Sequence, residues 1–120
     1  MLLAEALESA RSRIDGAKGL WLVGLDGVIV AGSGNDPGLR EEWLAASFTD
    51  IFRRVCSAGG EADLAAPAEM TVSGPSGVVV VRPLGDDHAL LAVVAADAIP
   101  GRARYQLRLV AEQVKAELLA

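Results

Sequence analysis

Cysteine and histidine are almost absent from this sequence, which has one residue of each, Cys56 and His88. A lone cysteine cannot form a disulfide within the chain, and it excludes a zinc site made of several cysteines. A lone histidine leaves few ways to bind a transition metal. Asp86 and Asp87 precede His88 and could bind a cation with it, but a solvated hairpin turn is the simpler interpretation. We therefore predict no metal site and no cofactor.

Recognisable catalytic groups are also lacking. One cysteine, one histidine and scattered acidic residues provide no nucleophile paired with a base. The glycine-rich segment 32–38, GSGNDPG, lacks the Lys-Ser or Lys-Thr pair that a phosphate-binding P-loop requires. We therefore predict that the protein is not an enzyme.

An excess of positive charge is missing as well. The chain has 11 lysines and arginines against 16 aspartates and glutamates, which gives a net charge of -5. A nucleic-acid-binding protein usually needs a basic stripe, and docking on anionic lipid needs basic clusters. The charge balance therefore argues against both kinds of partner.

Long hydrophobic runs do not occur either. No apolar run approaches the ~20 residues that span a bilayer, so we predict no membrane insertion. The first residues, MLLAEALESARSR, are amphipathic with their acidic residues before their basic ones, whereas a secretory signal has a basic region followed by an apolar one. We therefore expect a soluble, cytoplasmic protein.

Hydrophobic residues are plentiful, at 52% of the 120 residues, which predicts a single folded domain over residues 1–120. The segment Gly19–Gly32, GLWLVGLDGVIVAG, predicts a β-hairpin, because the pair Asp26-Gly27 accepts positive φ cheaply. Its two strands are apolar at every position over 20–23 and 28–31. Such short apolar strands are typical of a sheet covered on both faces, so we expect helices above and below this hairpin.

The remaining elements follow from the spacing of apolar residues. They are a helix over 2–14 before the hairpin, a helix from the loop 33–38 to about residue 58, strands over 69–73, 78–81 and 89–96, and a helix over 100–119. Every link between consecutive strands is short, so those strands pair in antiparallel fashion. The predicted fold class is α/β (α+β), a five-stranded antiparallel sheet sandwiched by helices in the order α-β-β-α-β-β-β-α.

The middle helix has recognisable signals at both ends. Asp36 is predicted to cap its N-terminus, with Pro37 in the first turn. The pair Gly59-Gly60 is predicted to end it.

The middle helix also has two distinct faces on a helical wheel of about 100° per residue. We predict a sheet-facing arc of Leu44, Phe48, Ile51 and Val55, widened on one side by Ala45, Phe52 and Cys56. Trp43 falls outside this arc, on a stripe with Ser47, Asp50 and Arg54. This helix therefore has more apolar surface than one sheet needs.

Simple geometry predicts a second copy of the chain. Five strands at ~4.8 Å span roughly 20 Å or slightly more, and one helix covers about 10 Å of that width. Two helices can cover one face of the sheet, but the third covers only about half of the other. The alternating strand 69–73 is expected at an edge, where its unpaired backbone can bind its copy. We predict a homodimer whose interface includes Phe52, Cys56, Met70, Thr71, Val72 and Ser73.

The chain resembles the roadblock family, the dynein light chain roadblock type, over essentially its whole length. The matching features are the hairpin GLWLVGLDGVIVAG, the long helix after a polar loop, and the three-strand meander that ends in ALLAVVA. The last helix begins similarly to the family's Gly-x-x-Arg pattern, with Gly101 and Arg104 in the matching places. Pro100 stands where the family often has a leucine.

This resemblance implies a five-stranded sheet with the first and last helices on one face and the middle helix on the other. It also implies homo- or heterodimers joined by the middle helices and the third strands. Members of the family act as scaffolds and as regulators of small Ras-like GTPases. The predicted function is therefore a non-enzymatic dimeric adaptor for such a GTPase, with partner contacts at Trp43, Ser47, Asp50 and Arg54.

Alternatives remain open at this point. A ligand-sensing or purely structural module could have a similar architecture, although a sensor needs a cavity with convergent polar groups. Trp43 could lie flat over its own helix, and Cys56 could be redox-active, although plain packing explains it better. Five arginines could contact phosphate, but a solvated helix face is the simpler explanation for them: Arg53, Arg54, Arg102, Arg104 and Arg108.

Overall fold

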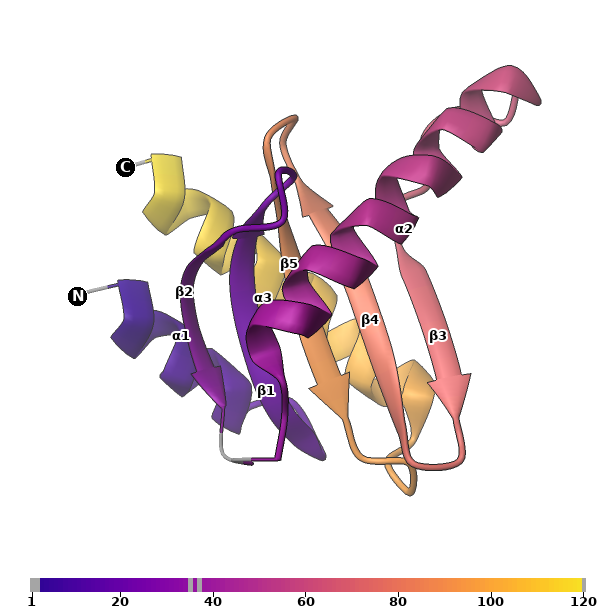
Figure 1. Ribbon diagram of the computed structural model, residues 1–120. Coiled ribbons are helices and arrows are strands. Elements are labelled where there is room, and N and C mark those ends of the chain that lie inside the picture. The colour runs from indigo at the N-terminus through magenta and orange to yellow at the C-terminus, as the bar shows by residue number, and fades with distance from the viewer. Residues whose placement is uncertain (1–2, 35, 37, 120) are drawn as a thin grey trace.

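The computed structural model describes residues 3–34, 36 and 38–119 and confirms the predicted fold class (Figure 1). Its elements are α1 (Leu3–Ser12), β1 (Ala17–Gly24), β2 (Ile29–Gly34), α2 (Glu41–Glu61), β3 (Met70–Gly74), β4 (Gly77–Leu84), β5 (His88–Val94) and α3 (Pro100–Leu119). The five strands form one antiparallel sheet in the spatial order β2-β1-β5-β4-β3. Strand β3 lies at an edge, as its alternating sequence predicts.

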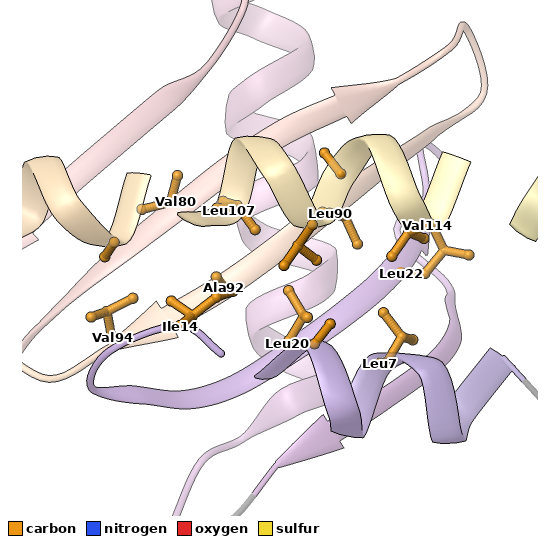
Figure 2. Close-up of a cluster of buried hydrophobic side chains, with 14 of the residues drawn as sticks. Leu7, Ile14, Leu20, Leu22, Val80, Leu90, Ala92, Val94, Leu107 and Val114 are labelled. Carbon is orange, nitrogen blue, oxygen red and sulfur yellow. The ribbon is translucent and has the colours of Figure 1, made fainter. Parts of the chain in front are cut away.

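The helices form two layers on opposite faces of the sheet, as expected (Figure 1). Helices α1 and α3 cover one face, where Leu7 of α1 and Leu107 of α3 pack on Leu20 and Leu90 of the central strands (Figure 2). Helix α2 covers the other face, where Phe52 packs with Trp21 and Leu91. None of the helices in the described part of the chain is long and apolar enough to cross a membrane.

Strands β1 and β5 lie at the centre of the sheet and are buried on both faces. Along β1, Leu20 and Leu22 face α1 and α3, whereas Trp21 and Val23 face α2. This alternation follows from the period of two in a strand. The prediction of coverage on both faces is therefore confirmed for the first strand of the hairpin.

The same prediction is wrong for the second strand of the hairpin. Strand β2 lies at the opposite edge from β3, and Val28 and Val30 are 62% and 51% exposed. The pairing register shifts because Val30 is an extra residue between Ile29 and Ala31, which makes a β-bulge. Ile29 then packs toward α2 and Ala31 toward α1, while Val30 points away from both clusters. An apolar run that contains a bulge at a sheet edge does not need a cover on each face.

Helix α2 begins later and ends later than the sequence predicts. Asp36 does not cap it: its side-chain Oδ1 accepts the N–H of Gly38 at 2.8 Å and its carbonyl accepts the N–H of Leu39 at 3.1 Å. This local turn occupies the acceptor, so the helix starts at Glu41, and Arg40 at the N-cap position makes no side-chain capping hydrogen bond. Pro37 lies outside the described residues.

At its other end, α2 continues through Gly59 and Gly60 to Glu61. The chain then folds back so closely that a Cβ on Gly59 would lie 2.5 Å from the carbonyl oxygen of Ala65. The N–H of Leu64 donates to the carbonyl of Gly59 at 2.8 Å. Gly59 therefore permits the close return of the chain, instead of ending the helix.

Candidate interaction surface on helix α2

The line of Ala45, Thr49, Phe52 and Cys56 faces the sheet, which corrects the predicted centre of the arc. Ala45, Thr49 and Phe52 are at most 2% exposed, and the half-buried Cys56 packs against the same cluster. A helix can approach a sheet closely where its side chains are short, and Ala45 and Thr49 permit this approach. The predicted centre of the arc was wrong because Ile51 and Val55 were expected to lie underneath the helix, whereas they are 43% and 38% exposed at its side.

Four larger apolar residues form the outer side of this buried line, and we call them the α2 flank: Leu44, Phe48, Ile51 and Val55. Leu44 and Phe48 are half-buried against the sheet, whereas Ile51 and Val55 are 43% and 38% exposed. The spacing of four, three and four residues keeps them on one side of the helix. The α2 flank is therefore a continuous apolar line with solvent along its outer border.

The predicted dimer-interface residues occupy two different environments. Phe52 is only 2% exposed in the protein's own core, so it has almost no free surface to offer a second copy. Cys56 and Met70 are half-buried in that same cluster. Along edge strand β3, residues 71–73 are exposed. The structure thus leaves the strand edge and the α2 flank accessible, and both border one apolar cluster through Met70, Leu44 and Phe48.

The predicted partner-binding residues lie on one line of α2, at its solvent side. Trp43 is 53% exposed at the first turn of the helix, and Ser47 is half-buried one turn later. The guanidinium carbon of Arg40 lies 5.4 Å from the centroid of the Trp43 ring, within the range of a cation–π interaction. Trp43 therefore has one neighbour that steadies it and much of its surface free.

Two ion pairs continue this line toward the C-terminus of α2. The carboxylate of Asp50 lies 3.2 Å from Nε of Arg54 and 3.4 Å from Nη2 of Arg53. The Arg54 side chain is 80% exposed and that of Asp50 is 47% exposed, so water screens both pairs. These charged groups can exchange their mutual contact for contacts with a partner at little cost in free energy.

Arg40 is a member of this surface that sequence reasoning missed. Its spacing of three residues from Trp43 is the signal that could have found it, because side chains at this spacing lie near each other along a helix. Glu41 is a second missed residue: its Oε2 accepts the indole N–H of Trp21 at 2.8 Å and ties the start of α2 to strand β1.

Comparison with solved structures identifies the fold. The Roadblock/LC7 domain from Streptomyces avermitilis is similar, with a TM-score of 0.85 and 19% identity over 98% of each chain. Myxococcus xanthus MglB has a TM-score of 0.86 and 11% identity, over 97% of this chain and 94% of that one. MglB in a tetrameric arrangement has a TM-score of 0.85 and 18% identity, over 95% of this chain and 85% of that one.

No family model matches the sequence, and no curated protein matches it. The likeness to solved structures therefore rests on shape, and it shows that this chain has the roadblock fold. Any function of this chain therefore has to be inferred from the side chains of α2 and their surroundings.

Proposed function

We propose that this protein is a dimeric adaptor without catalytic residues of its own, which binds a small Ras-like GTPase and alters its nucleotide cycle. The observation that carries this proposal is a half-exposed Trp43 beside the accessible α2 flank, on a roadblock fold. The sequence resemblance to a family that includes GTPase regulators supports the choice of client. The similarity in shape to MglB is a further support.

The proposed dimer uses the α2 flank and the edge of β3. Ile51 and Val55 supply exposed apolar surface, and residues 71–73 supply an unpaired strand edge. These residues take the place of Phe52, whose surface is already used in the core. Pairing through the α2 flank and the β3 edge would bring the Trp43, Ser47, Asp50 and Arg54 stripes of the two copies toward each other. The two stripes would then form one larger binding surface, which we call the platform.

The platform has the composition of a contact site. A half-exposed tryptophan can act as an anchor, and Ser47, Asp50 and Arg54 supply a polar rim around it. An adaptor of this kind acts by holding the switch loops of the GTPase in one arrangement. It must therefore bind one nucleotide state of the GTPase more tightly than the other.

Replacing Trp43 by alanine is expected to weaken GTPase binding by about 2 kcal/mol, which is the loss typical of an aromatic anchor. GTPases encoded beside this protein are titrated by calorimetry against the parent and the Trp43→Ala variant, each in its GDP state and with a non-hydrolysable GTP analogue. The dimer should remain intact, because Trp43 lies off the α2 flank.

Tyr105→Ala is the matched control, because Tyr105 is 54% exposed but belongs to α3 on the opposite face of the sheet. It should leave GTPase affinity unchanged. Equal affinity of Trp43→Ala and the parent would place the docking surface elsewhere. Absence of binding in both nucleotide states would mean that the adaptor has another client.

A further inference from the structure

A polar cleft of about 280 Å³ lies where the start of α3 meets strand β4 and the residues before β3. Its lining includes Glu69, Arg82, Gly101, Arg104, Tyr105 and Arg108. Arg82 pairs with Leu90, whose side chain packs toward α1 and α3, so the cleft is on the face opposite α2. The cleft is therefore separate from the proposed GTPase surface.

Glu69 organises this cleft. Its side chain is only 10% exposed, and each of its carboxylate oxygens accepts from a different arginine. Oε2 lies 3.2 Å from Nη1 of Arg82, and Oε1 accepts from Nε of Arg104. One carboxylate thus holds two guanidinium groups from separate elements in place. Their remaining N–H groups therefore have fixed positions in the cleft.

The cleft has more positive charge than it neutralises internally. Three arginines and one glutamate line it, which leaves two positive charges in a protein whose net charge is -5. Among the residues that the structure describes, Arg108 forms no ion pair; its guanidinium carbon lies 5.2 Å from the centroid of the Tyr105 ring. Arg82 and Arg104 each use one nitrogen on Glu69, and their other nitrogens form no hydrogen bond with another side chain within residues 3–34, 36 and 38–119.

The first turn of α3 adds a weaker attraction for negative charge. Gly101 lines the cleft, and a Cβ built on it would meet no atom within 4 Å, so its backbone is open to a ligand. The N-terminus of a helix has a partial positive charge. Here Pro100 has no N–H and the N–H groups of Arg102 and Ala103 donate to the carbonyl of Ile99, so the contribution is that charge and the N–H of Gly101. This effect supplements the arginines, which are the main feature of the site.

We propose that this cleft binds a phosphate dianion, either inorganic phosphate or the phosphate group of a small phosphorylated molecule. The dianion would neutralise the two excess positive charges of the cleft. A carboxylate has one negative charge and two acceptor oxygens, fewer than the guanidinium groups of the cleft can engage, whereas a phosphate monoester has three terminal oxygens. Guanidinium groups also match phosphate geometry in a bidentate manner.

Titration with inorganic phosphate at constant ionic strength, followed by amide NMR shifts, tests this proposal. We expect shifts at Gly101, at residues 104–108 and at Glu69, with saturation in the millimolar range or below. Arg108→Gln should weaken binding about tenfold, because it removes charge-assisted hydrogen bonds without touching Glu69. Arg108 is exposed and unpaired among the described residues, so this variant should fold as the parent does.

Arg102→Gln is the matched control, because it removes the same charge from the same helix outside the cleft, where Arg102 pairs with Asp15 at 2.8 Å. It should weaken phosphate binding by less than about twofold. Absence of shifts at ~10 mM phosphate, or equal weakening by both variants, would overturn the proposal. A parallel titration with glycerol 3-phosphate separates the sources: tighter binding of the ester supports a phosphorylated small molecule, and tighter binding of phosphate supports the free ion.

Discussion

Replacing Trp21 by alanine is expected to lower the free energy of unfolding by about 3–5 kcal/mol, the cost typical of removing a buried aromatic side chain. Trp21 is 1% exposed and lies between β1 and α2, in the cluster that contains Phe52. Its indole N–H also donates to Glu41 at 2.8 Å. The substitution would remove both the packing and the hydrogen bond that hold the start of α2 on the sheet.

Two glycines make this loss difficult to repair. A Cβ on Gly32 would lie 2.0 Å from Cδ1 of Trp21, and a Cβ on Gly19 would lie 2.2 Å from Cη2. The ring therefore fills space left by absent side chains on β1 and β2. In the alanine variant no neighbouring side chain at these positions can move into the cavity, so the cost should fall at the upper part of the range for such substitutions.

Urea unfolding at one fixed protein concentration measures this effect, since dimerisation would otherwise shift apparent stability. The control is Trp43→Ala, which removes the other tryptophan from a half-exposed position and should cost less than about 1 kcal/mol. Gly32→Ala adds a coupling test: it should be destabilising in the parent but nearly neutral in the Trp21→Ala background. Equal costs of Gly32→Ala in both backgrounds would contradict the contact between this ring and Gly32.

The central strands could be predicted from sequence because their environment allows only one kind of residue. Strands β1 and β5 are enclosed by helices on both faces, so nearly every position is apolar and the pattern is unambiguous. Val30 is an exception to this inference from apolar pattern to burial, because the same apolar pattern occurs in an edge strand with a bulge. Periodicity alone does not reveal which strand has a neighbour on each side.

The orientation of α2 could not be read from its wheel, although the existence of the helix could. Its apolar arc is broad, and the flank residues Ile51 and Val55 are more hydrophobic than Ala45 and Thr49. The structure instead buries Ala45 and Thr49, whose short side chains let the helix backbone approach the sheet, together with Phe52, whose ring packs in the Trp21 cluster. A helical wheel based on hydrophobicity alone therefore predicts that the α2 flank faces the sheet.

The sequence named Arg104 and Arg108 among the arginines that could contact phosphate, but it did not reveal the cleft at Glu69 that brings them together. The Glu69 carboxylate binds Arg82 and Arg104, which are separated from it by 13 and 35 positions and belong to different elements. The alternation of the predicted strand 69–73 does not show that a helix covers Glu69. Only the assembled fold brings α3 over this position. The structure also gives Arg104, the arginine of the Gly-x-x-Arg pattern, a role in joining α3 to the start of β3.

Replacing Ile51 by aspartate is expected to weaken the proposed homodimer at least about 100-fold. The two-fold symmetry of a homodimer places the substitution in the interface twice. Because only the exposed 43% of Ile51 remains to be buried, each copy loses apolar burial of about 1 kcal/mol, and each gains a carboxylate that must lose water on association, which costs more. Light scattering at micromolar concentration should show the parent as a dimer and this variant as a monomer, with unchanged circular dichroism because Ile51 is 43% exposed in the single chain.

Leu109→Asp is the matched control for this substitution, because Leu109 is 48% exposed on α3, away from the α2 flank. It introduces the same charge in place of a similar side chain, so a general effect of charge on association would appear in both variants. The dimer should persist in Leu109→Asp and be lost in Ile51→Asp.

A monomeric parent would contradict the dimer proposal. Loss of the dimer in Leu109→Asp alone would show that the interface lies on α3. Because the GTPase platform is proposed to need two Trp43 stripes, Ile51→Asp should also weaken GTPase binding, even though Trp43 itself is unchanged.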